Sequence, residues 1–170
     1  MTLATVLKAG ALAVLCLLVA PAGADETPGT APLIGAWTLV RVDNIQPDGS
    51  PVPLYGPNPQ GLLIFDRSGH YALQLLRAGR SSFAANDKSK GTPEEYKAAS
   101  LDSNAHYGTY AVDPDGRNIR FRIEHASFPN WDGTVQTRPF TLTGDRLTYK
   151  VPSPTIDRGA TGEVVWQRLP

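Results

Sequence analysis

Apolar and polar residues alternate along most of the chain beyond residue 33, which is the pattern of strands with one buried face. The clearest run is 117–125, where the apolar face also carries His125 and the opposite face is charged. We expect the apolar face to point into the core, which would place His125 inside. Eight segments rich in β-branched and aromatic residues predict strands, at 33–43, 61–66, 70–77, 105–113, 117–125, 134–143, 146–152 and 161–169.

Short turns separate most of these strands. Arg67-Ser68-Gly69, residues 114–116 and Gly144-Asp145 are typical hairpin turns. We therefore predict an all-β fold, an eight-stranded antiparallel up-and-down barrel, because closure removes exposed strand edges. A two-sheet sandwich is the alternative, and the short turns favour the barrel. An eight-stranded barrel is either filled by side chains or holds one small ligand.

Residues 78–104 lack a strand pattern and predict one short inserted helix. Thr92 suits the N-cap, Pro93 the first turn, and Glu95 completes a capping box. Glu94 and Glu95 lie at the positive end of the helix dipole, so we interpret them as capping residues and not as a catalytic pair. Because long loops in compact domains often act as lids, we expect this segment to cover one barrel opening.

The N-terminus has the pattern of a secretory signal. Lys8 precedes an apolar run, and a small-residue motif ends at Ala24. The run is shorter than the ~20 residues that span a bilayer, so we expect no membrane anchor. The small-residue motif predicts cleavage after Ala24. The predicted organisation is a signal peptide at 1–24, a flexible Pro/Gly-rich leader at 25–32 and one domain at 33–170, located in the periplasm or secreted.

The cysteine content and charge balance of the chain limit which kinds of partner it could bind. Removing residues 1–24 takes away the one cysteine, Cys16, and leaves 15 basic against 16 acidic side chains. Without an excess of either sign, nothing attracts nucleic acid or an anionic membrane. We expect a monomer or weak homodimer that folds without disulfides.

Several stretches resemble the lipocalin-like domain family of bacteria and fungi. The chain carries a Gly-x-Trp start in "LIGAWTLV", followed by "YGPNPQGLLIFDRSGHYALQLLR", "GTPEEYKAA", "YGTYAVD", "FPNWDGT" and "LTGDRLTYKVP". The resemblance runs from about Leu33 to Trp166 and implies a calycin-type barrel around a small-molecule cavity. It also suggests that Arg168 stacks on Trp37 at one end of the barrel.

Trp131 stands out because its loop, "FPNWDGT", gives it no strand face. We predict that the loop folds across the barrel mouth, so that the ring forms part of the pocket rim while Asn130 and Asp132 are exposed. A tryptophan that only plugs the barrel end is the alternative. The complete set of expected ligand-binding residues is Tyr55, Gln74, Tyr107, Tyr110, His125, Trp131 and Arg138.

Motifs for other chemistry are missing from the sequence. There is no nucleophile elbow, phosphate loop or dinucleotide fingerprint. The three histidines show no His-x-His spacing, so we expect neither a metal site nor a cofactor.

Three functions remain open at this point. The first is a binding module for a small hydrophobic or amphipathic molecule. The second is a cyclase or isomerase in which Tyr110 and His125 transfer protons within a shaped cavity. The third is a filled barrel that acts through its surface.

Overall fold

The computed structural model describes residues 29–157 and 159–170, so the predicted signal peptide and residues 25–28 lie outside the described residues. Eight strands form the barrel: β1 (Gly35–Ile45), β3 (Gln60–Phe65), β4 (His70–Leu76), β5 (Ser103–Val112), β6 (Asn118–Ala126), β7 (Val135–Thr143), β8 (Arg146–Val151) and β9 (Thr161–Arg168). A short strand, β2 (Pro51–Pro53), pairs with the end of β1 outside the ring.

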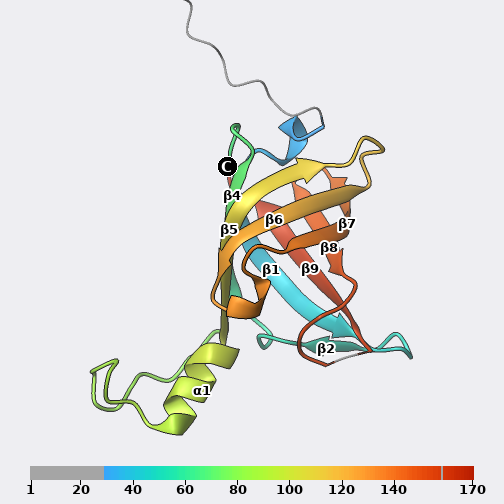
Figure 1. Ribbon diagram of the computed structural model, residues 1–170. Helices are drawn as coiled ribbons and strands as arrows, with labels where there is room; N and C mark the ends of the chain where they lie inside the picture. The colour runs from blue at the N-terminus through green and yellow to red at the C-terminus, as the bar shows by residue number, and fades with distance from the viewer. Residues whose placement is uncertain (1–28, 158) are drawn as a thin grey trace, which may run out of the picture.

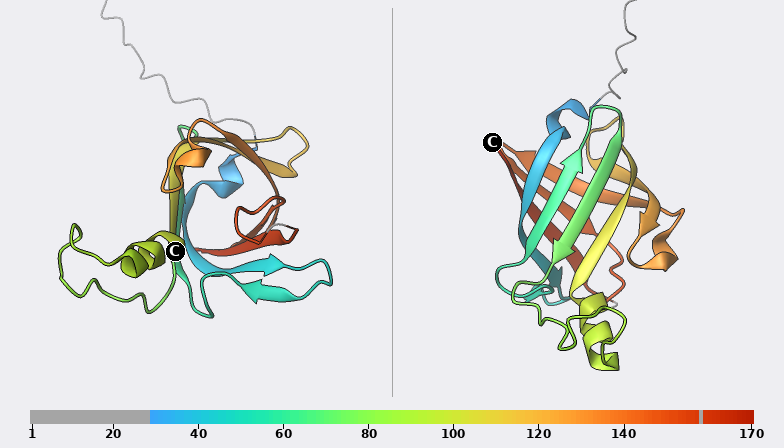
Figure 2. Two further views of the ribbon diagram at one scale, coloured as in Figure 1. Left: turned by 60° about the horizontal axis from the view of Figure 1, so that its bottom comes forward. Right: turned by 90° about the vertical axis from the view of Figure 1, so that its left-hand side faces the viewer.

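The sheet closes on itself. Consecutive barrel strands pair antiparallel, and β1 pairs with both β3 and β9. Figures 1 and 2 show the resulting ring. The predicted up-and-down barrel is therefore confirmed, and the sandwich is excluded.

One end of the barrel is plugged. The 3-10 turn η1 (Ala31–Leu33) lies across it, and Trp37 Nε1 donates to Leu33 O at 2.9 Å. Arg168 covers the Trp37 ring at 4.1 Å from its centroid, as the resemblance suggests, and also donates to Ile34 O at 2.8 Å. Thr30 is buried, so residues 30–32 belong to this plug and not to a flexible leader.

A bulge breaks the alternation where β5 meets β6. Tyr107 pairs with His125 but Gly108 pairs with Ile123, so Glu124 has no opposite residue. A Cβ on Gly108 would lie 2.1 Å from Arg122 O, so only glycine allows the strands to approach this closely. Ile119, Phe121 and Ile123 face the core as predicted, whereas the extra residue turns His125 to the outside.

The inserted helix, α1 (Pro93–Leu101), begins with the predicted capping box between Thr92 and Glu95. It buries none of its residues and lies beside the open end of the barrel, not across it (Figure 2). The expectation that residues 78–104 cover the opening is therefore wrong, because the helix lacks an apolar face large enough to hold it there. None of the helices in the described part of the chain is long and apolar enough to cross a membrane.

Candidate functional site

The barrel interior is not completely filled. Toward the end opposite η1, a cavity leaves about 70 Å³ accessible to the centre of a water-sized molecule. One water needs roughly 10–15 Å³ by this measure, so the space fits several waters or part of a small organic molecule. The open end is the lower one in Figure 1.

The cavity wall is mainly apolar. Strands β1, β4, β8 and β9 contribute aliphatic side chains and Tyr149, while Leu54 and Tyr55 come from the segment after β2. The loop between β8 and β9 supplies Pro154, Thr155 and Ile156 at the mouth, and Asn44 Nδ2 holds it by donating to Ile156 O at 3.1 Å. A wall of this kind suits an apolar ring or chain with few polar groups.

A chain of hydrogen-bonded polar side chains reaches this wall through His106 and Arg138. Tyr71 Oη lies 2.7 Å from His106 Nδ1, and Arg138 Nη2 lies 3.4 Å from His106 Nε2. Because a guanidinium only donates, Nε2 must accept, which leaves the imidazole proton on Nδ1 facing the Tyr71 oxygen. Arg138 Nη2 also donates to Gln136 Oε1 at 2.7 Å.

Burial keeps these groups in their uncharged forms, Arg138 excepted. Desolvation, with the nearby Arg138 charge, lowers the pKa of His106 from 6.5 to about 2. Desolvation raises the pKa of Tyr71 and of Tyr149, and the Arg138 charge opposes both shifts. At neutral pH His106 is therefore a neutral imidazole and a poor proton acceptor.

Three of the cavity-lining side chains carry a buried polar atom without a hydrogen-bond partner among the described residues. These atoms are Asn44 Oδ1, Arg138 Nε and Tyr149 Oη. Buried polar groups are normally paired, so unpaired ones in a cavity wall indicate where a ligand's polar atoms would bind.

Trp131 lies at the rim of this cavity. It ends the 3-10 turn η2 (Pro129–Trp131), lines the cavity, and contacts His106 edge-on with ring centroids 5.8 Å apart. The ring is half-buried whereas Asn130 and Asp132 are exposed, as predicted. Asp132 fastens the turn: Oδ1 accepts from Ala126 N at 2.7 Å and Oδ2 lies 3.2 Å from His125 Nδ1.

The structure brings three of the seven expected residues to the cavity: Tyr55, Trp131 and Arg138. Their role in binding stays a prediction. Gln74 and Tyr107 are on the outer face, because alternation puts Tyr71, Leu73 and His106 inside instead. His125 is outside because of the bulge in β6.

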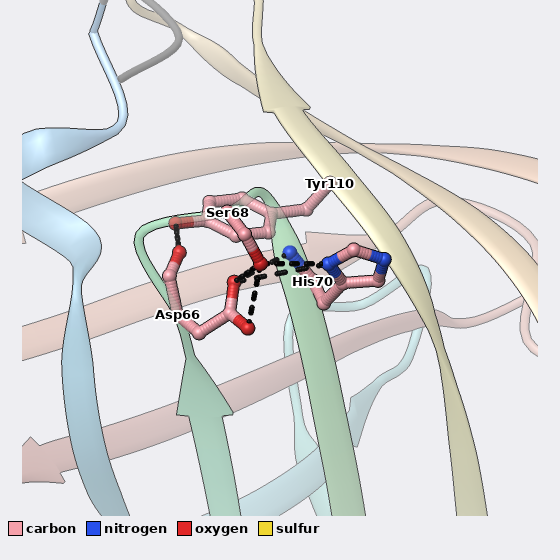
Figure 3. Close-up of polar contacts among 4 residues, drawn as sticks. All are labelled: Asp66, Ser68, His70 and Tyr110. Carbon is pink, nitrogen blue, oxygen red and sulfur yellow. Dashed lines mark hydrogen bonds and ion pairs between the residues drawn. The ribbon is translucent and has the colours of Figure 1, made fainter. Parts of the chain in front are cut away.

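Tyr110 is buried but belongs to the plugged end. Its hydroxyl donates to Asp66 O at 2.9 Å, at the turn between β3 and β4 (Figure 3). With Tyr110 in the core and His125 on the surface, the pair proposed for proton transfer does not converge.

The same turn holds an aspartate, a serine and a histidine in contact. Ser68 Oγ lies 2.8 Å from Asp66 Oδ1 and 2.8 Å from His70 Nδ1, and His70 N donates to Asp66 Oδ1 at 2.8 Å (Figure 3). In a nucleophilic triad the histidine sits between the serine and the aspartate, whereas here the serine is central. This exposed network stabilises a hairpin turn.

Among the residues that the structure describes, no cluster of side chains has the composition to hold a metal ion.

Sequence reasoning missed Asn44, His106 and Tyr149 as cavity residues. His106 shares a strand face with Tyr110, so alternation alone could have placed it inside. Gly108 in the middle of a strand was the signal for the bulge. Asn44 gave no signal, because its position depends on how the loop between β8 and β9 closes.

Comparison with known proteins agrees with this architecture. The profile of the lipocalin-like domain family matches residues 34–169. The chain belongs to that family. It is also 29% identical, over 106 residues, to the 4'-hydroxy-3'-methoxypropiophenone carrier protein ppsC of Aspergillus oryzae, a match that covers 57% of this chain and 95% of the relative. Family and relative together support small-molecule binding.

Proposed function

We propose that this lipocalin-like protein carries a small amphipathic molecule with an aromatic ring in the open end of its barrel. The observation that carries the proposal is the cavity itself, an apolar space inside the barrel whose wall includes three unpaired buried polar atoms. A filled barrel acting through its surface would have no need for such a wall.

The named relative supports the choice of ligand class. A hydroxy-methoxypropiophenone is one aromatic ring bearing an acyl group and oxygen substituents, and that protein is named as its carrier. The aromatic side chains Tyr55, Trp131 and Tyr149 suit such a ring, because offset and edge-on contacts between rings add to the free energy of burial. A whole molecule of that size exceeds the present cavity, so the mouth residues Pro154, Thr155 and Ile156 would have to move outward.

A carrier is favoured over an enzyme by the state of the polar groups. The histidine in the cavity wall has a pKa of about 2, far from the value near neutrality that suits a general base. The remaining polar groups are suited to orienting a bound molecule.

We also propose that the protein is secreted or periplasmic and works as a monomer or weak homodimer. The signal-like sequence at 1–24 supports the first part, and the balanced charge is compatible with the second. Intact-mass measurement of protein purified from the producing cells tests cleavage after Ala24. An uncleaved N-terminus would contradict the proposed location.

Ligand binding is tested by titration with 4'-hydroxy-3'-methoxypropiophenone while tryptophan fluorescence is recorded. The chain has three tryptophans, of which only Trp131 lines the cavity. We expect Trp131→Phe to remove most of the fluorescence change, and the matched control Trp166→Phe, buried in the core, to retain it. Equal signals in both variants would contradict a site at the Trp131 rim. Native mass spectrometry of protein from its own cells would then identify the natural ligand.

A further inference from the structure

Arg138 is a buried cation in an otherwise uncharged environment. Its side chain on β7 is only 4% exposed, and its guanidinium carbon lies 4.8 Å from the Phe121 ring centroid and 5.0 Å from that of Tyr149. The hydrogen bonds that it makes go to neutral groups, Gln136 and His106. No ion pair between residues described by the structure includes Arg138.

Burying a guanidinium is unfavourable in free energy unless a negative charge pairs with it. Removing a cation from water is strongly unfavourable, and cation–π contacts offset only part of that cost. The titratable side chains around the guanidinium supply no negative charge, because burial raises the pKa of Tyr71 and of Tyr149 and keeps His106 neutral. None of the side chains in contact with the guanidinium among the described residues supplies a negative charge.

We infer that Arg138 binds an anionic oxygen of the ligand, so that the molecule carried is an aromatic monoanion, with a carboxylate or phenolate group on a ring. This inference rests on the proposed carrier function and specifies its ligand. Arg138 Nε is buried and unpaired in the cavity wall. The Tyr149 hydroxyl faces the N–H donors of Arg138 and Trp166, so its own proton is free to donate beside Nε. Asn44 Oδ1, an unpaired acceptor, would take a donor elsewhere on the ligand, such as a ring hydroxyl.

A purely structural role for Arg138 makes the opposite prediction about stability. If the guanidinium stabilised the fold, replacing it with methionine would lower the free energy of unfolding. If it is an unpaired charge kept for a ligand, Arg138→Met should leave the unliganded protein equally stable or more stable, because apolar replacements of buried charges often do so.

The test uses benzoate and benzamide, which have the same shape and differ in charge. Each is titrated at pH 7 up to the millimolar range while amide chemical shifts are recorded. We expect benzoate to bind about ten-fold more tightly, with shifts around His106, Trp131 and Tyr149, since hydrogen bonds between charged groups are stronger than those to a neutral acceptor.

Arg138→Met should abolish the preference for benzoate. Arg138→Lys should keep only part of it, because lysine lacks the planar guanidinium with its paired N–H donors. The matched control is Arg122→Met, which removes an exposed arginine from the outer face of β6 and should leave the preference unchanged. A preference that survives Arg138→Met overturns the inference, as does a loss of stability in that variant without ligand. Equal binding of both probes in the cavity overturns this inference alone, and no binding of either overturns the carrier function as well.

Discussion

Two arginines stack on aromatic rings in this barrel, one at the plugged end and one in the cavity. Arg168 lies over Trp37, donates to backbone carbonyls of the η1 region, and has Asp145 3.3 Å from its Nε. Arg138 lies over the rings of Phe121 and Tyr149, and its hydrogen-bond partners among the residues that the structure describes are neutral. The plugged end is thus complete without a ligand, whereas the cavity is not.

The largest effect should come from the tryptophans of the two ends. Trp37→Ala removes a fully buried ring, and we expect a loss of about 3–5 kcal/mol in the free energy of unfolding. Trp131→Ala removes a half-buried rim residue and should cost roughly 1–2 kcal/mol. Urea denaturation of both variants checks this, with Trp37→Phe available should the alanine variant not fold. Equal losses would mean that the two ends are structurally equivalent.

Acid should destabilise the cavity through His106. The unfolded chain takes up a proton near pH 6.5, while the folded pKa is about 2, so the unfolded state binds more protons throughout this range. The free energy of unfolding should therefore fall as pH drops below 6.5, by up to ~2 kcal/mol at pH 5. His106→Gln should flatten this part of the profile, whereas His125→Gln, which changes an exposed histidine, should not. A wild-type profile that is flat between pH 5 and 6.5 would contradict the buried, neutral histidine.

The two arginines should respond differently to the same substitution. We expect Arg168→Met to lower the free energy of unfolding by about 1–2 kcal/mol, because it loses hydrogen bonds to the plug and the contact with Trp37. Arg138→Met should not lower it. Thermal unfolding of both variants in parallel measures the difference. If both lost stability equally, Arg138 would be a structural residue like Arg168.

The smallest effect concerns the turn that carries Trp131. Hydrogen bonds from His125 and from Ala126 N lower the pKa of Asp132, so this anchor is fully present above pH 3.8 and is lost as pH falls through the lowered value. Asp132→Asn should speed amide exchange in residues 128–134 at neutral pH and leave global unfolding nearly unchanged. Asp115→Asn, a carboxylate in an exposed turn at 113–117, is the control. Unchanged exchange in Asp132→Asn would show that the turn is held by other contacts.

The sequence was sufficient for the barrel but only partly so for its cavity. Alternation predicted the eight strands and the inward set Ile119, Phe121 and Ile123, because period-two burial is a local property. It failed for His125, since one bulged residue reverses the faces after it. It located the capping box of α1 but not the place of the helix, which depends on tertiary contacts absent from any local pattern.

The polar groups of the cavity likewise include some that the local pattern predicts and some that depend on tertiary contacts. Arg138 shares a strand face with Phe140, so alternation could place it inside. The meeting of Asn44, His106 and Tyr149 depends instead on strand stagger and on the closure of the loop between β8 and β9. Sequence therefore predicted which chemistry was available, and only the three-dimensional arrangement showed that the guanidinium has no counter-charge among the described residues.

The plug formed by η1 also has a kinetic consequence. With that end closed, a molecule must leave the cavity by the route it used to enter, past Trp131 and the segment at 154–156. A second molecule cannot push the first out from behind, so exchange requires complete dissociation before the next association. Because the bound state also needs this segment moved outward, substitutions that stiffen it should lower the association rate relative to the dissociation rate and so raise the dissociation constant.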